Sequence, residues 1–274
     1  MTSVLSWNIQ CGKGIDGEIR IDRIARVIRE LGDPDVICLQ EVSRKLPLLD
    51  GVAPTDQVDE LAALFPHHVP VFGAAVQTAD WAFGNLTLTR LPLHSVVLHA
   101  LPQPNLPGIR YMQRQATELN LQAGELALRV TNTHLEYHAA FQRLAQVRRL
   151  LEIHAEIVTN QRTPPAYAST GPYRDIGRAE HAVLCGDFNM TTLSQEYREL
   201  VEKSSPRLYD AWEVLKPGTD HPPTCGIFDH QQWPEGPHCR DFFFVTDTIA
   251  QSVRSVQVDT TTDASDHQPL MLEF

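Results

Sequence analysis

The chain has 274 residues, of which 42% are hydrophobic and 21% charged, a composition typical of a soluble globular protein. No run approaches the roughly 20 apolar residues that span a bilayer, so we expect a cytoplasmic protein without stable membrane insertion. The net charge of −11 argues mildly against broad non-specific DNA binding, and the five scattered cysteines argue against a disulfide framework or a structural zinc site.

Apolar periodicity predicts alternating strands and helices along the first half of the chain. Residues 4–9 alternate as in a strand, 21–31 have helical spacing, and 35–39 form the short apolar run of a strand covered on both faces. A helix capped by Thr55 or Asp56 is expected to end at Phe65. Further strands are expected at 69–76, 83–89, 94–100, 115–121 and 125–133.

The second half is expected to begin with the longest helix, over residues 139–159. Its inner stripe would consist of Phe141, Leu144, Val147, Leu150, Leu151 and Ile157. Strands are expected at 241–245, 253–258 and 268–274. Residues 103–114, 160–180 and 216–239 are expected to be loops that form the walls of a groove and decide the substrate. Because the polar motifs run from Asn8 to His267, we expect a single domain over residues 1–274.

The stretch Gly186-Asp187-Phe188-Asn189 follows the apolar run Ala182-Val183-Leu184-Cys185. A carboxylate and a carboxamide thus stand two residues apart at the end of a predicted buried strand. Side chains at i and i+2 of a strand point to the same side, so Asp187 and Asn189 would face one point in space. Taken alone, the stretch is equally compatible with a tight turn, since Gly, Asp and Asn all favour turns.

Similar short polar motifs stand at the exits of other predicted strands, and each has a plain structural alternative. Glu41 alone is compatible with a solvated strand end, Ser265-Asp266-His267 with a polar loop, and His134 with a satisfied core histidine. Asp241, which opens the apolar run Phe242-Phe243-Phe244, needs a partner to offset its burial, and His267 is a natural candidate.

Together these residues supply what metal-assisted phosphoryl hydrolysis requires. Divalent ions such as Mg²⁺ take oxygen ligands, which Glu41 and Asp266 can provide. Asp187 can orient or deprotonate a water molecule. Hydrogen-bond donors for phosphate oxygens are available from Asn8, Asn189, His134 and His267. No Gly-x-Ser-x-Gly nucleophile motif is present.

At these residues the chain resembles the endonuclease/exonuclease/phosphatase superfamily of metal-dependent phosphoesterases, which includes exonuclease III-like nucleases and deoxyribonuclease I. The resembling elements appear in the family's order and cover nearly the whole chain. They are Ser6-Trp7-Asn8-Ile9, Leu39-Gln40-Glu41-Val42, Gly84-Asn85-Leu86-Thr87-Leu88, Asn132-Thr133-His134-Leu135-Glu136, Gly186-Asp187-Phe188-Asn189, Arg240-Asp241-Phe242 and Ser265-Asp266-His267. The resemblance implies a four-layer α/β sandwich, in which two mixed β-sheets pack face to face between helices and the site lies at one end.

The resemblance also implies a role for each site residue. Glu41 would be the main ligand of Mg²⁺, or of Mn²⁺, with Asn8 and Asp266 nearby. Asp187 would activate the attacking water. The remaining roles concern phosphate: Asn189 and His134 would bind it, His267 would contact a non-bridging oxygen and be oriented by Asp241, and Arg114 stands where many members place an arginine or tyrosine near the site.

One position departs from the family pattern. Many members have an arginine two residues before the aspartate that matches Asp241, and here that position is His238. Arg240 stands next to Asp241 instead. In a strand this shift would turn the guanidinium to the other face, which puts a supporting role for Arg240 in doubt.

The function that these residues favour is divalent-metal-dependent hydrolysis of a phosphodiester or phosphomonoester by direct attack of water. The negative net charge favours a small-molecule or lipid-derived substrate. The alternative is a nuclease for DNA or RNA, whose phosphate-binding rim would consist of Arg110, Arg114, Arg174 and Arg178. A catalytically silent binding module on the same scaffold and a partner-binding protein with a coincidental acidic cluster are remote alternatives.

Overall fold

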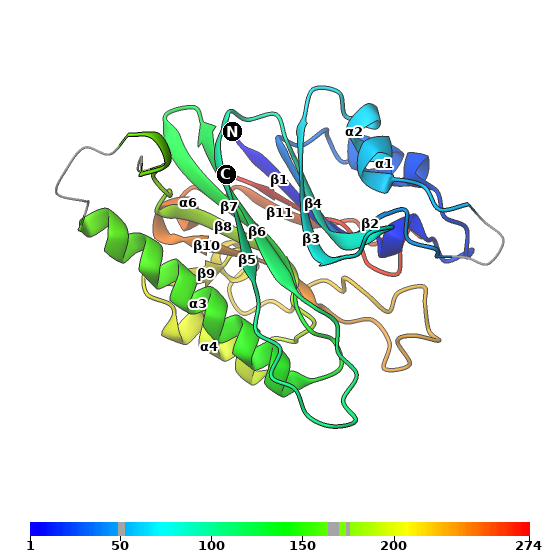
Figure 1. Ribbon diagram of the computed structural model, residues 1–274. Helices are drawn as coiled ribbons and strands as arrows, with labels where there is room; N and C mark the ends of the chain where they lie inside the picture. The colour runs from blue at the N-terminus through cyan, green and yellow to red at the C-terminus, as the bar shows by residue number, and fades with distance from the viewer. Residues whose placement is uncertain (49–52, 164–169, 174–175) are drawn as a thin grey trace.

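The computed structural model describes residues 1–48, 53–163, 170–173 and 176–274. Two six-stranded mixed sheets form its centre (Figure 1). The first sheet, in spatial order β11-β12-β1-β2-β4-β3, contains β1 (Ser3–Asn8), β2 (Val36–Arg44), β3 (Val69–Gln77), β4 (Ala82–Thr89), β11 (Ser255–Val258) and β12 (Leu270–Glu273). The second, in order β5-β6-β7-β8-β10-β9, contains β5 (Leu93–Ala100), β6 (Gln115–Ala123), β7 (Leu126–His134), β8 (His181–Asp187), β9 (Leu208–Asp210) and β10 (Asp241–Thr246).

Helices cover the outer face of each sheet (Figure 1). The first sheet carries α1 (Ile21–Glu30) and α2 (Gln57–Leu64), and the second carries α3 (Ala140–Arg162) and α4 (Gln195–Lys203). Shorter helical segments are η1 (Gln10–Gly12), η2 (Gly171–Tyr173), α5 (Ala211–Leu215) and α6 (Asp247–Ala250). None of the helices in the described part of the chain is long and apolar enough to cross a membrane.

Three apolar clusters hold the four layers together. The central cluster joins the inner faces of the two sheets, with Val4 and Cys38 from one and Val130 and Cys185 from the other. A second cluster packs α1 and α2 onto the first sheet, and a third packs α3 and α4 onto the second. Burial of apolar surface on both faces of each sheet explains why β2 and β8 are nearly continuous apolar runs.

The strand topology brings distant polar residues to one end of the sandwich. In each sheet one central pair is parallel, β1 with β2 and β7 with β8, and the other pairs are antiparallel. The carboxyl ends of a parallel pair meet at the same sheet edge. Asn8 therefore lies beside Gln40, and His134 beside Asp187.

Most observed helices and strands agree with the expected ones within a few residues. In the first half, β2 continues to Arg44 although it was expected to end at Leu39, and η1 was not expected. The second half has further differences. Phe141 was expected in the inner stripe of α3, but it is exposed, and the polar side chains of Gln142 and Gln146 are buried instead. Helices α4, α5 and α6 and strand β9 were not expected. Residues 216–239 contain no helix or strand, as expected, while the predicted loop over 160–180 holds the short η2, and its Pro164-Pro165 falls outside the described residues.

Candidate active site

Asp187 lies at the centre of the polar cluster at this end of the sandwich. It is only 1% exposed. Its Oδ2 accepts a hydrogen bond from Asn8 Nδ2 at 3.0 Å and lies 3.3 Å from His134 Nε2 and 3.6 Å from His267 Nε2. Burial alone would raise the pKa of Asp187. The charge of His267 and the hydrogen bond from Asn8 help to lower this pKa below its usual value. Asp187 is thus a buried carboxylate that stays ionised.

Asn189 reaches the same cluster by a route that strand alternation did not predict. Strand β8 ends at Asp187, and Asn189 has a left-handed backbone with φ 50°. Its N–H donates to Asp187 Oδ1 at 2.8 Å, the pattern of an Asx turn. Its Nδ2 donates to the Leu135 carbonyl at 3.0 Å and lies 3.1 Å from His134 Nε2. The Asp187 and Asn189 side chains are therefore brought together by a turn.

His267 is held by Asp241, the partner expected for that buried carboxylate. His267 Nδ1 and Asp241 Oδ2 are 2.8 Å apart, and Thr224 Oγ1 donates to the same Oδ2 at 2.6 Å. Burial alone would lower the pKa of His267. The negative charges of three neighbours, Asp241, Asp187 and Asp266, raise this pKa well above its usual value. Burial raises the pKa of Asp241 to about 6. His267 is thus an imidazolium whose Nε2 faces Asp187.

A second acidic group consists of Glu41 and Asp266. Glu41 lies in a bulge of β2 with φ 55°, a conformation that turns it toward the site, and it is half-buried. Burial and the charge of Asp266 raise the pKa of Glu41 to about 7. Burial also raises the pKa of Asp266, whose Oδ2 accepts from Gln232 Nε2 at 3.0 Å. Two carboxylates that repel each other are a set of oxygen donors suited to a hard divalent cation.

Asn8 links the two acidic groups. Its Nδ2 donates to Glu41 Oε1 and to Asp187 Oδ2, at 3.0 Å in each case, and its Oδ1 accepts from the Gln10 backbone N–H at 3.1 Å. In this arrangement the amide nitrogen, and not the oxygen, faces the carboxylates. The predicted role of Asn8 as a metal ligand stays a prediction.

Asp187, Asp241 and His267 also form a compact group that could hold a metal ion. One ligand atom from each lies within 4.8 Å of the others. All three residues are buried. The hydrogen bond between His267 and Asp241 already occupies Nδ1, however, and a protonated imidazole has no lone pair to give a metal.

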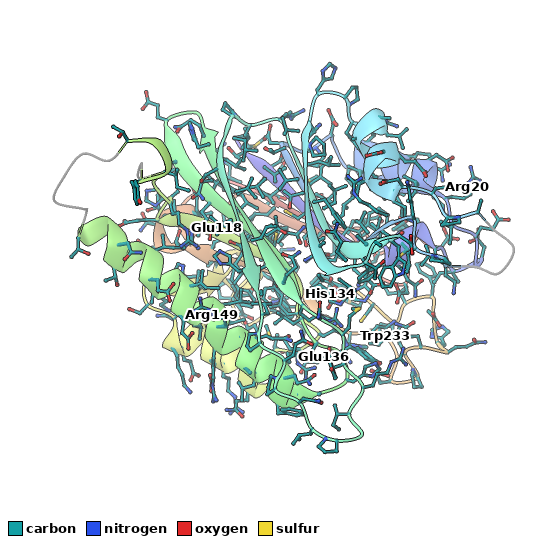
Figure 2. The ribbon with its side chains drawn as sticks, viewed as in Figure 1. Arg20, Glu118, His134, Glu136, Arg149 and Trp233 are labelled. Carbon is teal, nitrogen blue, oxygen red and sulfur yellow. The ribbon has the colours of Figure 1, made fainter. Side chains whose placement is uncertain are left out.

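Arg114 lies in the site, as expected. It is the residue immediately before β6, a strand of the second sheet. It is 6% exposed, and its Nε is 3.5 Å from Glu136 Oε2. Burial lowers the pKa of Arg114, while the charges of Glu136, Glu41 and Asp187 act in the opposite direction. In the view of Figure 2, Glu136, His134 and Trp233 are labelled in the same region, away from Glu118. The sequence indicated Glu136 only as part of a motif and assigned it no role.

Arg240 lies in the wall of the site, although a shift to the other face was expected. Strand β10 begins at Asp241, so strand alternation does not apply to the residue before it. Arg240 Nη1 donates to the Asn189 carbonyl at 3.3 Å, and the guanidinium carbon lies 4.7 Å from the Trp233 ring centroid. Trp233 in turn packs edge-on against His267, with 5.7 Å between ring centroids. Neither the position of Trp233 nor that of Thr224 was predicted, because the loop that carries them has no periodicity.

The four arginines expected to form a rim for nucleic acid have different surroundings. Arg178 donates from Nε to the buried Glu118 at 2.7 Å, Arg114 is buried inside the site, and Arg110 is exposed. Arg174 lies outside the described residues. The three described arginines therefore do not form the continuous rim that was expected.

The chain belongs to the Endonuclease/Exonuclease/phosphatase family, because residues 5–267 match the profile of that family. Members of this family are metal-dependent phosphoester hydrolases. The chain thus has a phosphoesterase scaffold with a buried cluster of Asp187, Asp241 and His267. No curated protein matches its sequence.

Solved structures confirm the predicted fold. An endonuclease/exonuclease/phosphatase from Beutenbergia cavernae aligns over 99% of this chain and 70% of its own, with a TM-score of 0.69 and 23% identity. A truncated TDP2 from Caenorhabditis elegans aligns over 99% and 96%, with a TM-score of 0.65 and 19% identity. A mannosyl-6-phosphatase from Bacteroides thetaiotaomicron aligns over 100% and 99%, with a TM-score of 0.70 and 18% identity.

Proposed function

We propose that this protein hydrolyses a phosphate ester, a diester or a monoester, by direct attack of a water molecule that Asp187 orients and deprotonates. One observation carries the proposal. Asp187 is buried and ionised, yet its Oδ2 is surrounded by Asn8, His134 and His267, the residue types that a phosphate site requires. A carboxylate in this position can accept a proton from water at the moment of attack.

The metal that this chemistry needs fits best beside Glu41 and Asp266. Both are carboxylates without a cationic side chain bound to them among the described residues. The pKa of Glu41 is raised by burial and by repulsion from Asp266, and a bound cation would counteract both effects. Mg²⁺ or Mn²⁺ bound there would neutralise charge on the phosphoryl group and help to ionise a water. We favour this position over the Asp187, Asp241 and His267 group because Nδ1 of His267 is already bonded to Asp241 and the surrounding carboxylates raise the pKa of the imidazole.

The remaining residues would bind the phosphate. His267 can donate from Nε2 to a non-bridging oxygen, since its Nδ1 is fixed by Asp241. Arg114 adds a buried positive charge, and Asn189 and His134 lie next to Asp187 and to each other. The negative net charge and the scattered arginines favour a small-molecule or lipid-derived ester over long duplex DNA.

Hydrolysis of two chromogenic esters tests the proposal. Wild-type protein should cleave bis-p-nitrophenyl phosphate or p-nitrophenyl phosphate with Mg²⁺ or Mn²⁺ and lose this activity in EDTA, and Asp187→Ala should be inactive. Cleavage of the diester would establish a phosphodiesterase, and cleavage of the monoester alone a phosphatase. Full activity in Asp187→Ala would contradict the proposal. If oligonucleotides are cleaved, a steep fall of the rate with salt would indicate the nuclease alternative.

A further inference from the structure

Glu136 is a completely buried carboxylate beside the site, and the chemistry above does not use it. Its backbone is fixed from two sides by α3, because its N–H donates to Gln146 Oε1 and Arg143 Nη1 donates to its carbonyl, both at 2.9 Å. Its Oε1 accepts from the His138 N–H at 2.9 Å, and its Oε2 accepts from the Met112 N–H at 3.3 Å. The carboxylate is therefore an anchored group with little freedom to move.

Arg114 is the only cationic side chain against this anchor in the described part of the chain, and its own contacts are few. The single polar contact of its guanidinium there is between Nε and Glu136 Oε2, at 3.5 Å, which is longer than a hydrogen bond. A guanidinium carries five N–H donors, and a buried one without partners is costly. The unpartnered donors of Arg114 are thus available to an anion that enters the site.

Three carboxylates compete for this guanidinium. Burial lowers the pKa of Arg114, while the charges of Glu136, Glu41 and Asp187 all act to raise it, and Glu136 is the one in contact, at 3.5 Å. Glu41 and Asp187 are the residues that would hold the metal and activate the water. If Glu136 were neutral, the strongest remaining attraction on Arg114 would come from them. An ion pair between Arg114 and Asp187 or Glu41 would occupy the space of the phosphate and neutralise a group that must stay available.

We propose that Glu136 is a positioning residue that holds Arg114 at the phosphate site and keeps it from pairing with Asp187 and Glu41. The inference rests on the proposed function. It assigns Glu136 an effect that passes through Arg114, and therefore predicts that the two residues are energetically coupled. A residue that only supported the fold of the loop around Met112 would not show this coupling.

Steady-state kinetics of a double-mutant cycle tests the coupling, with the ester that wild type hydrolyses. We expect Glu136→Gln, which has an oxygen for either the His138 or the Met112 N–H group but not for both, to lower kcat/KM by roughly 10- to 100-fold through misplacement of Arg114. The Glu136→Gln/Arg114→Ala double variant should be no worse than Arg114→Ala alone. Glu136→Asp keeps the charge and should retain more activity than Glu136→Gln. Losses that multiply, or wild-type kinetics in Glu136→Gln, would overturn the inference.

Glu199→Gln is the matched control, because Glu199 is also a buried carboxylate paired with an arginine, Arg148 at 2.9 Å, on the outer helices α3 and α4. It should leave kcat and KM unchanged. Melting temperatures of the two Gln variants show whether a loss in Glu136→Gln comes from the fold. An equal loss of activity in Glu199→Gln would overturn the inference.

Binding of inorganic phosphate, measured by calorimetry, gives a readout that does not depend on turnover. Wild type should bind phosphate, and Glu136→Gln and Arg114→Ala should both bind it more weakly. If phosphate binding depends on both residues but wild type hydrolyses no ester, the proposed function fails and the positioning role stands. If wild type hydrolyses an ester and Glu136→Gln matches it in phosphate binding, the positioning role fails and the function stands. Absence of phosphate binding by wild type would overturn the inference.

Discussion

Asp241 and His267 are joined by a 2.8 Å hydrogen bond between Oδ2 and Nδ1, although one begins strand β10 and the other precedes β12. The bond fixes the imidazole ring so that Nε2 faces Asp187 at 3.6 Å. It also explains why His267 keeps its proton in a buried position. The orientation and the charge of His267 thus both depend on Asp241.

Asp241→Asn should therefore impair His267 without unfolding the protein. An amide cannot stabilise the imidazolium as a carboxylate does, so the pKa of His267 should fall toward its usual value. Since the protonated form would be the phosphate donor, the basic limb of the pH–rate profile should move to lower pH, and kcat should fall by roughly 100-fold or more. The measurement is kcat over pH 5 to 9 for both proteins, and an unchanged basic limb would contradict the role of Asp241.

Glu41→Gln should weaken metal binding by at least about tenfold, because it removes a charged oxygen ligand. Calorimetric titration with Mn²⁺ measures this directly. Asp241→Asn is the informative comparison, since Asp241 belongs to the alternative group around His267. Loss of Mn²⁺ binding in Asp241→Asn, with normal binding in Glu41→Gln, would move the metal to that group.

Gly186→Ala should destabilise the fold at the base of the site. Gly186 has φ +141°, and a Cβ there would overlap the carbonyl oxygen of Thr133 on the neighbouring strand. We expect a loss of about 2–4 kcal/mol in the free energy of unfolding. Gly124→Ala is the control, because Gly124 also has a positive φ, +62°, but open space around it. Urea denaturation of both variants measures the difference, and equal losses would show that the contact with Thr133 is unimportant.

The ion pair between Glu118 and Arg178 should make stability depend on acid. Burial alone would raise the pKa of Glu118. The hydrogen bonds from Arg178 and His99 lower this pKa from 4.5 to about 2. A carboxyl group with a depressed pKa stabilises the folded protein at pH values above its pKa in the unfolded state. This stabilisation disappears as the pH falls from about 4.5 to 2. The shift corresponds to about 3 kcal/mol. In Glu118→Gln the free energy of unfolding should be lower near neutral pH and flatter over this range. A wild-type acid dependence in the variant would contradict the assignment.

The fold, and the meeting of most candidate site residues at one end of it, could be predicted because both depend on strand periodicity. Asn8, Glu41, His134 and Asp187 follow or end apolar runs, and parallel strand pairs bring such ends together. The resemblance of the motifs to a known family added the pairing of the two sheets. The prediction of the fold is confirmed by the topology and by the solved relatives.

Other features depend on backbone conformations and contacts that no local pattern encodes. The left-handed turn at Asn189 replaces strand alternation, and Arg240 precedes strand β10, so the strand geometry that would turn its guanidinium to the other face does not apply. Trp233 and Gln232 reach the site from a loop without periodicity. Arg178 was expected in a phosphate-binding rim, but it pairs with Glu118, which is far from it in sequence.

The most direct test of the account is turnover by Asp187→Asn on the ester that wild type hydrolyses. The amide is isosteric and can keep hydrogen bonds within the cluster, but it cannot accept a proton from water. We predict that kcat falls by roughly 1,000-fold or more while Mn²⁺ binding and the melting temperature stay close to wild type. A kcat within tenfold of wild type would show that Asp187 does not activate the water, and would contradict the central claim.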